Sequence, residues 1–193
     1  MTVNALNQPR REQSPILLAG WCTIVGAVLT FLLGIPLASF QNQTPLPVWI
    51  PALNAISHLL FLVGVIGLAR TGAAGRSLLA TGGLALTLFG LVVVTVAEFI
   101  SMVNMETAIL FFSSATLLMM VGLILLGIAV LRARRWTSWA RFMPLTCGLF
   151  VLLVMLPSFA LPGLASNYAI GFWGVCWLFL GVALITTTTQ EAG

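Results

Sequence analysis

The chain has 193 residues, of which 60% are hydrophobic and only 6% are charged. Soluble globular domains carry about 25% charged residues, so this composition excludes a soluble protein and indicates an integral membrane protein. The net charge of +4 reflects eight arginines against four glutamates, with no lysine and no aspartate. So few ionisable side chains leave little material for acid–base or metal chemistry.

Apolar runs follow one another along the chain, separated by short polar or proline-containing connections. Crossing a bilayer takes about 20 apolar residues, and each run is long enough. The sequence therefore predicts an all-α, polytopic membrane protein with one six-helix transmembrane domain over 15–188, between short tails at 1–14 and 189–193. The predicted spans are 15–39, 48–69, 77–103, 107–131, 142–161 and 167–186.

The arginines predict how the chain is oriented. They fall before the first span and around the second and fourth connections, and thus on one side of the membrane. The connections on the other side carry one charge, that of Glu106. Since cytoplasmic connections are rich in basic residues, both termini are predicted to be cytoplasmic, in a multi-pass protein of a bacterial plasma membrane.

The fourth connection concentrates basic side chains beside two tryptophans. Arginine pairs with phosphate through two parallel hydrogen bonds, which makes these side chains candidates for contact with lipid headgroups or with a membrane-protein partner. The alternative is that they only orient the chain. The candidates are Arg132, Arg134, Arg135 and Arg141. No separate feature indicates nucleic-acid binding.

Short segments recur at corresponding places in the chain. Residues 76–84 and 141–149 match at Arg, Thr, Gly and Leu, and three even-numbered spans end in Gly67-Leu-Ala, Gly127-Ile-Ala and Gly181-Val-Ala. One interpretation is three related helical hairpins around an axis along the membrane normal. The other is chance recurrence of common apolar residues.

Polar side chains within the predicted spans are the candidates for function, because burying them in hydrocarbon is costly. With a rise of about 1.5 Å per residue, Asn54, Glu98, Ser113 and Ser114 lie at one depth, about 8 to 10 Å below the outer ends of three neighbouring spans. His58 lies one turn deeper than Asn54 on the same helix face. We expect these residues to form a small outward-opening polar cavity, with water bridging His58 to Glu98.

A carboxylate and an imidazole so placed suit a small ligand, a lipid headgroup, a quinone carbonyl or a proton. They predict ligand or lipid binding for transport or sensing. The alternative is a structural or assembly subunit of a larger membrane complex, in which Glu98 reaches water and His58 bonds a backbone carbonyl. Homo-oligomers are compatible with either interpretation. An enzyme acting on a lipid or quinone is a third interpretation.

No catalytic residue, metal site or cofactor is predicted. The three cysteines and the single histidine are scattered along the chain without the spacing of a zinc site. No glycine-rich phosphate loop occurs either.

A further pattern carries a family resemblance. It consists of Gly64-x-x-Gly67-Leu-Ala-Arg70 at the end of the second span, followed by Arg76, Gly83 and Glu98. In this pattern the chain resembles small bacterial six-span membrane proteins of unassigned function, which implies the fold and no substrate. In size and topology it is also similar to the substrate-binding components of energy-coupling-factor vitamin transporters. It departs from them in its short outer connections and in lacking an Ala-x-x-x-Ala motif in the first span.

Overall fold

The computed structural model describes residues 8–42, 46–136, 138–161 and 163–190. Within these ranges the chain forms helices and no strand. Six segments are long and apolar enough to cross a membrane, which confirms the predicted all-α polytopic fold. They are Pro15–Gly34, Trp49–Arg70, Leu78–Ser101, Met105–Ala133, Ser138–Ser158 and Ala165–Thr187.

Five of these segments lie in single helices, and the fifth in chain order is composite. The single helices are α1 (Gln8–Gly34), α2 (Trp49–Arg70), α3 (Leu78–Ser101), α4 (Met105–Ala133) and α7 (Ala165–Gln190). The composite segment contains the 3₁₀ turn η2 (Ser138–Phe142), α5 (Met143–Phe150), the π-helical turn η3 (Val151–Met155) and α6 (Leu156–Ser158). A further 3₁₀ turn, η1 (Ala38–Asn42), follows α1.

The first helix ends five residues before the predicted end of its span, at Gly34 rather than at residue 39. Pro36 explains the difference, because proline disfavours helical geometry in the residue before it and has no N–H to continue the helix. Pro157 acts in a related way in the fifth segment. Its ring would clash with the carbonyl of Leu153, which lies in η3, and the Leu156 N–H instead bonds the Val151 carbonyl five residues back.

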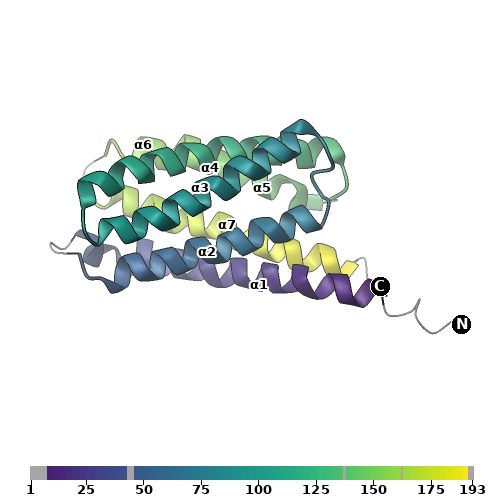
Figure 1. The fold of residues 1–193 in the computed structure, drawn as a ribbon, viewed down its shortest axis with the longest axis horizontal. Coiled ribbons are helices and arrows are strands. Elements are labelled where there is room, and N and C mark those ends of the chain that lie inside the picture. The colour runs from purple at the N-terminus through teal and green to yellow at the C-terminus, as the bar shows by residue number, and fades with distance from the viewer. Residues whose placement is uncertain (1–7, 43–45, 137, 162, 191–193) are drawn as a thin grey trace, which may run out of the picture.

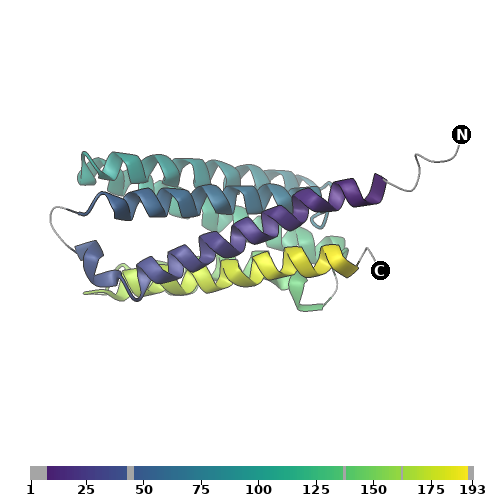
Figure 2. The same ribbon diagram turned by 90° about the horizontal axis from the view of Figure 1, so that it is seen from below.

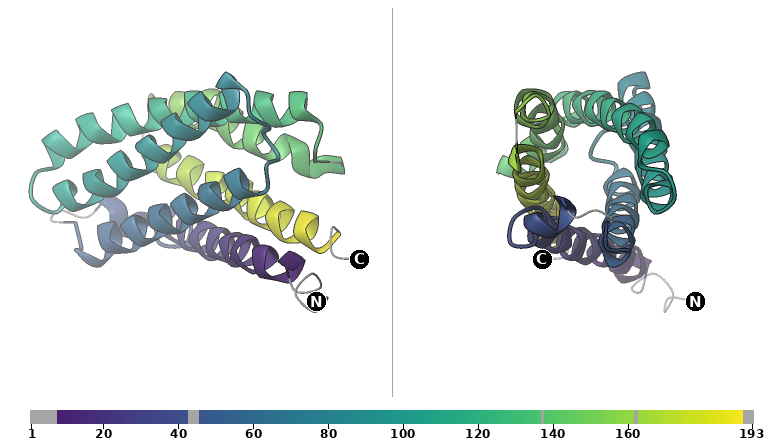
Figure 3. Two further views of the ribbon diagram at one scale, coloured as in Figure 1. Left: turned by 45° about the vertical axis from the view of Figure 1, so that its right-hand side comes forward. Right: turned by 90° about the vertical axis from the view of Figure 1, so that its left-hand side faces the viewer.

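The helices follow one another in chain order around a closed bundle (Figures 1 and 3). Contacts join α1 to α2, α2 to α3, α3 to α4, α4 to α5, α5 to α7, and α7 back to α1. Consecutive spans run antiparallel, so α1 begins and α7 ends at the same end of the bundle (Figure 2). We name this the arginine end, defined by Arg70, Arg76, Arg132, Arg134, Arg135 and Arg141, and the other the opposite end.

Large aromatic side chains fill the space between α2 and α7. Phe61 of α2 stacks on Trp177 of α7 with ring centroids 4.3 Å apart and an interplanar angle of 12°. Trp173 packs edge-on against both rings, and its Nε1 donates a hydrogen bond of 3.0 Å to the Cys147 carbonyl of α5. Because each aromatic side chain buries a large apolar area, this cluster ties three helices together.

Small residues bring neighbouring helices into close contact. A Cβ on Gly83 of α3 would lie 2.5 Å from the backbone nitrogen of Leu126 on α4. On α1, Ala19 faces Gly67 of α2, and Ala27 faces Gly174 of α7. These small residues are buried and form seams between helices of the same chain. Because lipid tails are as apolar as the side chains, the hydrophobic effect does not hold helices together within a membrane, and close packing at such seams takes its place.

The three hairpins α1–α2, α3–α4 and α5–α7 succeed one another around the bundle. Gly127 and Gly181 both pack on the first helix of the next hairpin, against Leu145 of α5 and Ile24 of α1 respectively. Gly67 instead packs on Ala19 of its own hairpin. The geometry thus matches for two of the three repeats, and duplication stays a hypothesis.

Candidate functional site

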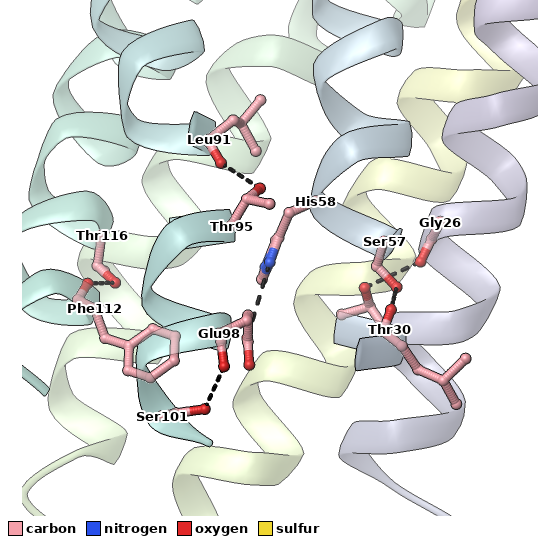
Figure 4. A network of polar contacts seen from close by, with 11 residues as sticks. Gly26, Thr30, Ser57, His58, Leu91, Thr95, Glu98, Ser101, Phe112 and Thr116 are labelled. Atoms are coloured by element: carbon pink, nitrogen blue, oxygen red, sulfur yellow. Dashed lines mark hydrogen bonds and ion pairs between the residues drawn. The ribbon is translucent and has the colours of Figure 1, made fainter. Parts of the chain in front are cut away.

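The candidate site lies where α2 packs against α3, and it joins His58 to Glu98 (Figure 4). The two helices run antiparallel, and each contributes one ionisable side chain. His58 Nδ1 lies 3.9 Å from Glu98 Oε1. Asn54 lies one turn before His58 on α2, and its side-chain amide lies beside the Glu98 carboxyl group. The structure therefore brings together three of the five predicted residues.

His58 and Glu98 are closer than their depths along the helices suggest. The sequence places them about 7 Å apart along the membrane normal, which favours a bridging water. Every Cα–Cβ bond in a helix tilts toward that helix's N-terminus, so side chains on antiparallel neighbours lean in opposite directions. His58 leans toward the opposite end and Glu98 toward the arginine end, and this lean closes the expected gap to 3.9 Å.

The site is enclosed by the protein. Glu98 is only 6% exposed. This burial argues against the alternative in which the Glu98 side chain reaches water. His58 Nδ1 is also buried and has no hydrogen-bond partner among the described residues, since 3.9 Å to the carboxylate exceeds hydrogen-bonding distance. The imidazole therefore retains an unused donor or acceptor.

The hydroxyl groups beside Glu98 on α3 are already engaged within their own helix. Thr95 Oγ1 donates to the Leu91 carbonyl at 2.7 Å, and Ser101 Oγ donates to the Glu98 backbone carbonyl at 2.6 Å (Figure 4). Such bonds to earlier carbonyls are the usual way for a hydroxyl to be satisfied inside a helix. Both oxygens keep the capacity to accept a hydrogen bond.

Ser113 and Ser114 do not join the cluster. Both are exposed on α4, where they donate to the Ile109 and Leu110 carbonyls at 2.8 and 2.9 Å. The structure corrects the expectation that they share a cavity with Glu98. Depth was estimated from residue spacing alone, which does not determine the direction in which a helix face points. The buried face of α4 instead carries Ala115.

Sequence reasoning missed Phe61, which adjoins the site. Its ring centroid lies 6.5 Å from that of His58, and it is fully buried against Trp177. The spacing of three residues from His58 places both on one helix face and was the available indication. Phe61 therefore contacts the polar cluster on one side and Trp177 of the aromatic cluster on the other.

The four predicted arginines of the fourth connection separate into different environments. Arg132 and Arg135 line a hollow at the arginine end, which Arg76 also lines. Arg134 caps α4 with a left-handed backbone, φ 51°, and is exposed. The Arg141 guanidinium lies 4.8 Å from the centre of the Phe142 ring, so it packs elsewhere.

No three His, Cys, Asp or Glu side chains gather as a metal site within the described ranges. The three cysteines are free thiols. No known protein family, curated protein or solved structure matches the chain.

Proposed function

We propose that the protein binds a small ligand or a lipid headgroup within the bilayer, through Glu98, His58 and Asn54, for transport or sensing. In this proposal the arginine end faces the cytoplasm of a bacterial cell and the ligand enters from the opposite end. Ligand binding there requires a small cavity at the cluster that opens outward. Ser113 and Ser114 are left outside the binding set, since they are exposed on α4.

One observation carries the proposal: a buried imidazole nitrogen without a partner lies 3.9 Å from a buried carboxyl group. An unsatisfied buried polar group costs about 1 to 3 kcal/mol, so such groups in native proteins call for a reason. A ligand group that bonds both the imidazole and the carboxyl group would remove this cost. Hydroxyl and amine groups have the required hydrogen-bonding capacity.

The experiment is native mass spectrometry of the protein gently extracted from its own membrane. We expect a stoichiometric small-molecule adduct on the parent protein and its loss from Glu98→Gln, because glutamine keeps the shape of glutamate and removes the ionisable group. The matched control is Glu106→Gln, the same exchange at an exposed position on α4. This control should retain the adduct.

Two results would contradict the proposal. One is an adduct that persists on Glu98→Gln, which would remove Glu98 from the site. The other is the absence of any adduct together with a consistently bound second polypeptide, which would establish the structural-subunit alternative. Thermal unfolding of both variants in the same detergent checks that neither exchange disrupts the fold.

A further inference from the structure

A second polar feature lies far from the Glu98 cluster, at the arginine end. An open hollow of about 320 Å³ lies between the turn that joins α2 to α3, the first turn of α3 and the end of α4. It has three charged lining residues: Arg76 from the turn, Arg132 from the last turn of α4, and Arg135 just beyond α4. Arg132 and Arg135 lie 56 and 59 positions after Arg76 in the chain, so distant segments place three arginines around one space.

The turn is built to hold this arrangement. Gly72 and Gly75 have positive φ angles of 66° and 69°, which glycine adopts without strain. Arg135 Nη1 donates a hydrogen bond of 3.1 Å to the Gly72 carbonyl and so connects the end of α4 to the turn. A guanidinium has five N–H donors, and this bond uses one of them.

No side chain that the structure describes neutralises the positive charge of the hollow. The carboxylates among the described side chains are those of Glu98 and Glu106, near the end of α3 and the start of α4, toward the opposite end of the bundle. Arg76 and Arg132 accordingly have no ion-pair partner among these side chains. The N-terminus of α3, capped by Ser77, adds a partial positive charge at the same place. Like charges gathered in one space repel each other, and an anion bound between them offsets that repulsion.

We propose that this hollow binds the phosphate group of an anionic lipid. Guanidinium groups pair with phosphate through charge-assisted hydrogen bonds, often two at a time. The hollow lies at the ends of membrane-spanning helices, where lipid phosphates are found, and basic pockets between such helices suit lipid headgroups. Its other lining residues are mostly apolar, with Leu79 and Ala129 among them, and these offer contact to acyl chains.

Lipid binding to the purified full-length protein tests the proposal. Dioleoylphosphatidylglycerol and dioleoylphosphatidylcholine, which share acyl chains, are titrated separately and the bound fraction is read by native mass spectrometry. The pocket variant replaces Arg76, Arg132 and Arg135 by glutamine. The control variant replaces Arg70, Arg134 and Arg141 by glutamine, removing equal charge from the same end outside the hollow.

We expect phosphatidylglycerol to bind the pocket variant at least about tenfold more weakly than the parent, since each lost charge-assisted bond contributes about a tenfold change or more. The control variant should lose less than about threefold, because none of its three arginines lines the hollow. Equal losses in the two variants, or equal binding of both lipids by the parent, would overturn the proposal.

Inorganic phosphate distinguishes the source of the anion. If millimolar phosphate displaces phosphatidylglycerol from the parent, the hollow is a free-phosphate site and the lipid proposal fails. If phosphate leaves the lipid bound, the acyl chains contribute to binding as proposed. Should the triple pocket variant not fold, as judged by helical circular dichroism, Arg76→Gln alone is compared with Arg70→Gln by the same criteria.

Discussion

The two buried tryptophans of α7 show how one side chain type serves two roles. Trp173 and Trp177 are both buried and four residues apart, and each contacts Phe61. The Trp173 indole nitrogen donates to the Cys147 carbonyl, whereas that of Trp177 has no hydrogen-bond partner among the described residues. Trp173 therefore contributes a polar tie to α5, and Trp177 contributes packing.

This difference predicts unequal costs for the same exchange. Trp173→Phe and Trp177→Phe each remove the same volume from the core, but only the first removes a hydrogen bond, which is worth about 0.5 to 1.5 kcal/mol. We expect Trp173→Phe to lower the free energy of unfolding by about 1 kcal/mol more than Trp177→Phe. Equilibrium unfolding in one detergent measures both variants, and equal losses would show that the hydrogen bond adds nothing to stability.

At the scale of elements, adjacent glycines on α3 occupy opposite environments. A Cβ on Gly83 would meet the backbone of Leu126 and of Gly122 on α4, at 2.5 Å from the nitrogen and 2.8 Å from the oxygen. A Cβ on Gly82 would meet nothing within 4 Å. Close packing of α3 against α4 thus requires glycine at position 83 and places no such requirement on Gly82.

Gly83→Ala should therefore destabilise the protein, while Gly82→Ala should not. The first exchange forces two backbones apart, and overpacking of this kind costs about 1 to 3 kcal/mol. The second adds a better helix former at an open position, with a gain of up to about 1 kcal/mol. Thermal unfolding of the two variants in the same lipid–detergent mixture provides the comparison. Similar unfolding midpoints for the two variants would show that a Cβ at position 83 does not force α3 and α4 apart.

At the scale of the whole molecule, the even number of spans brings the start of α1 and the end of α7 to the same end of the bundle (Figure 2). This is the arginine end, where Arg70 ends α2 and Arg132 lies in the last turn of α4. Which side of the membrane that end faces depends on the preference of arginine for the cytoplasmic side. Leu78, the first residue of α3, and Val103, in the turn that follows α3, are suitable reporters, because they are 92% and 91% exposed.

The orientation is tested by cysteine labelling of intact cells with a membrane-impermeant maleimide. We expect Val103→Cys to be labelled and Leu78→Cys to remain unlabelled until the cells are permeabilised. The parent chain, with its native cysteines, sets the background. If only Leu78→Cys were labelled in intact cells, the arginine end would face outward and the proposed orientation would be wrong. The packing of the helices would be unaffected by that result.

The candidate site was only partly predictable from the sequence. Asn54 and His58 were assigned to one face because helical spacing determines which residues of one helix lie together. Their approach to Glu98 depends on how two helices pack and on the opposite lean of their side chains. Ser113 and Ser114 have the expected depth yet face outward, since depth carries no information about rotation of a helix relative to its neighbours.

The sequence by itself determined the fold class, the six spans and the gathering of arginines at one end. These depend on composition and on distance along the chain, which are local quantities. Only the tertiary structure decided that Arg76 joins Arg132 and Arg135 around one hollow while Arg134 and Arg141 lie elsewhere. That grouping arises because the turn between α2 and α3 packs beside the end of α4, and contacts between distant segments are set by packing rather than by spacing.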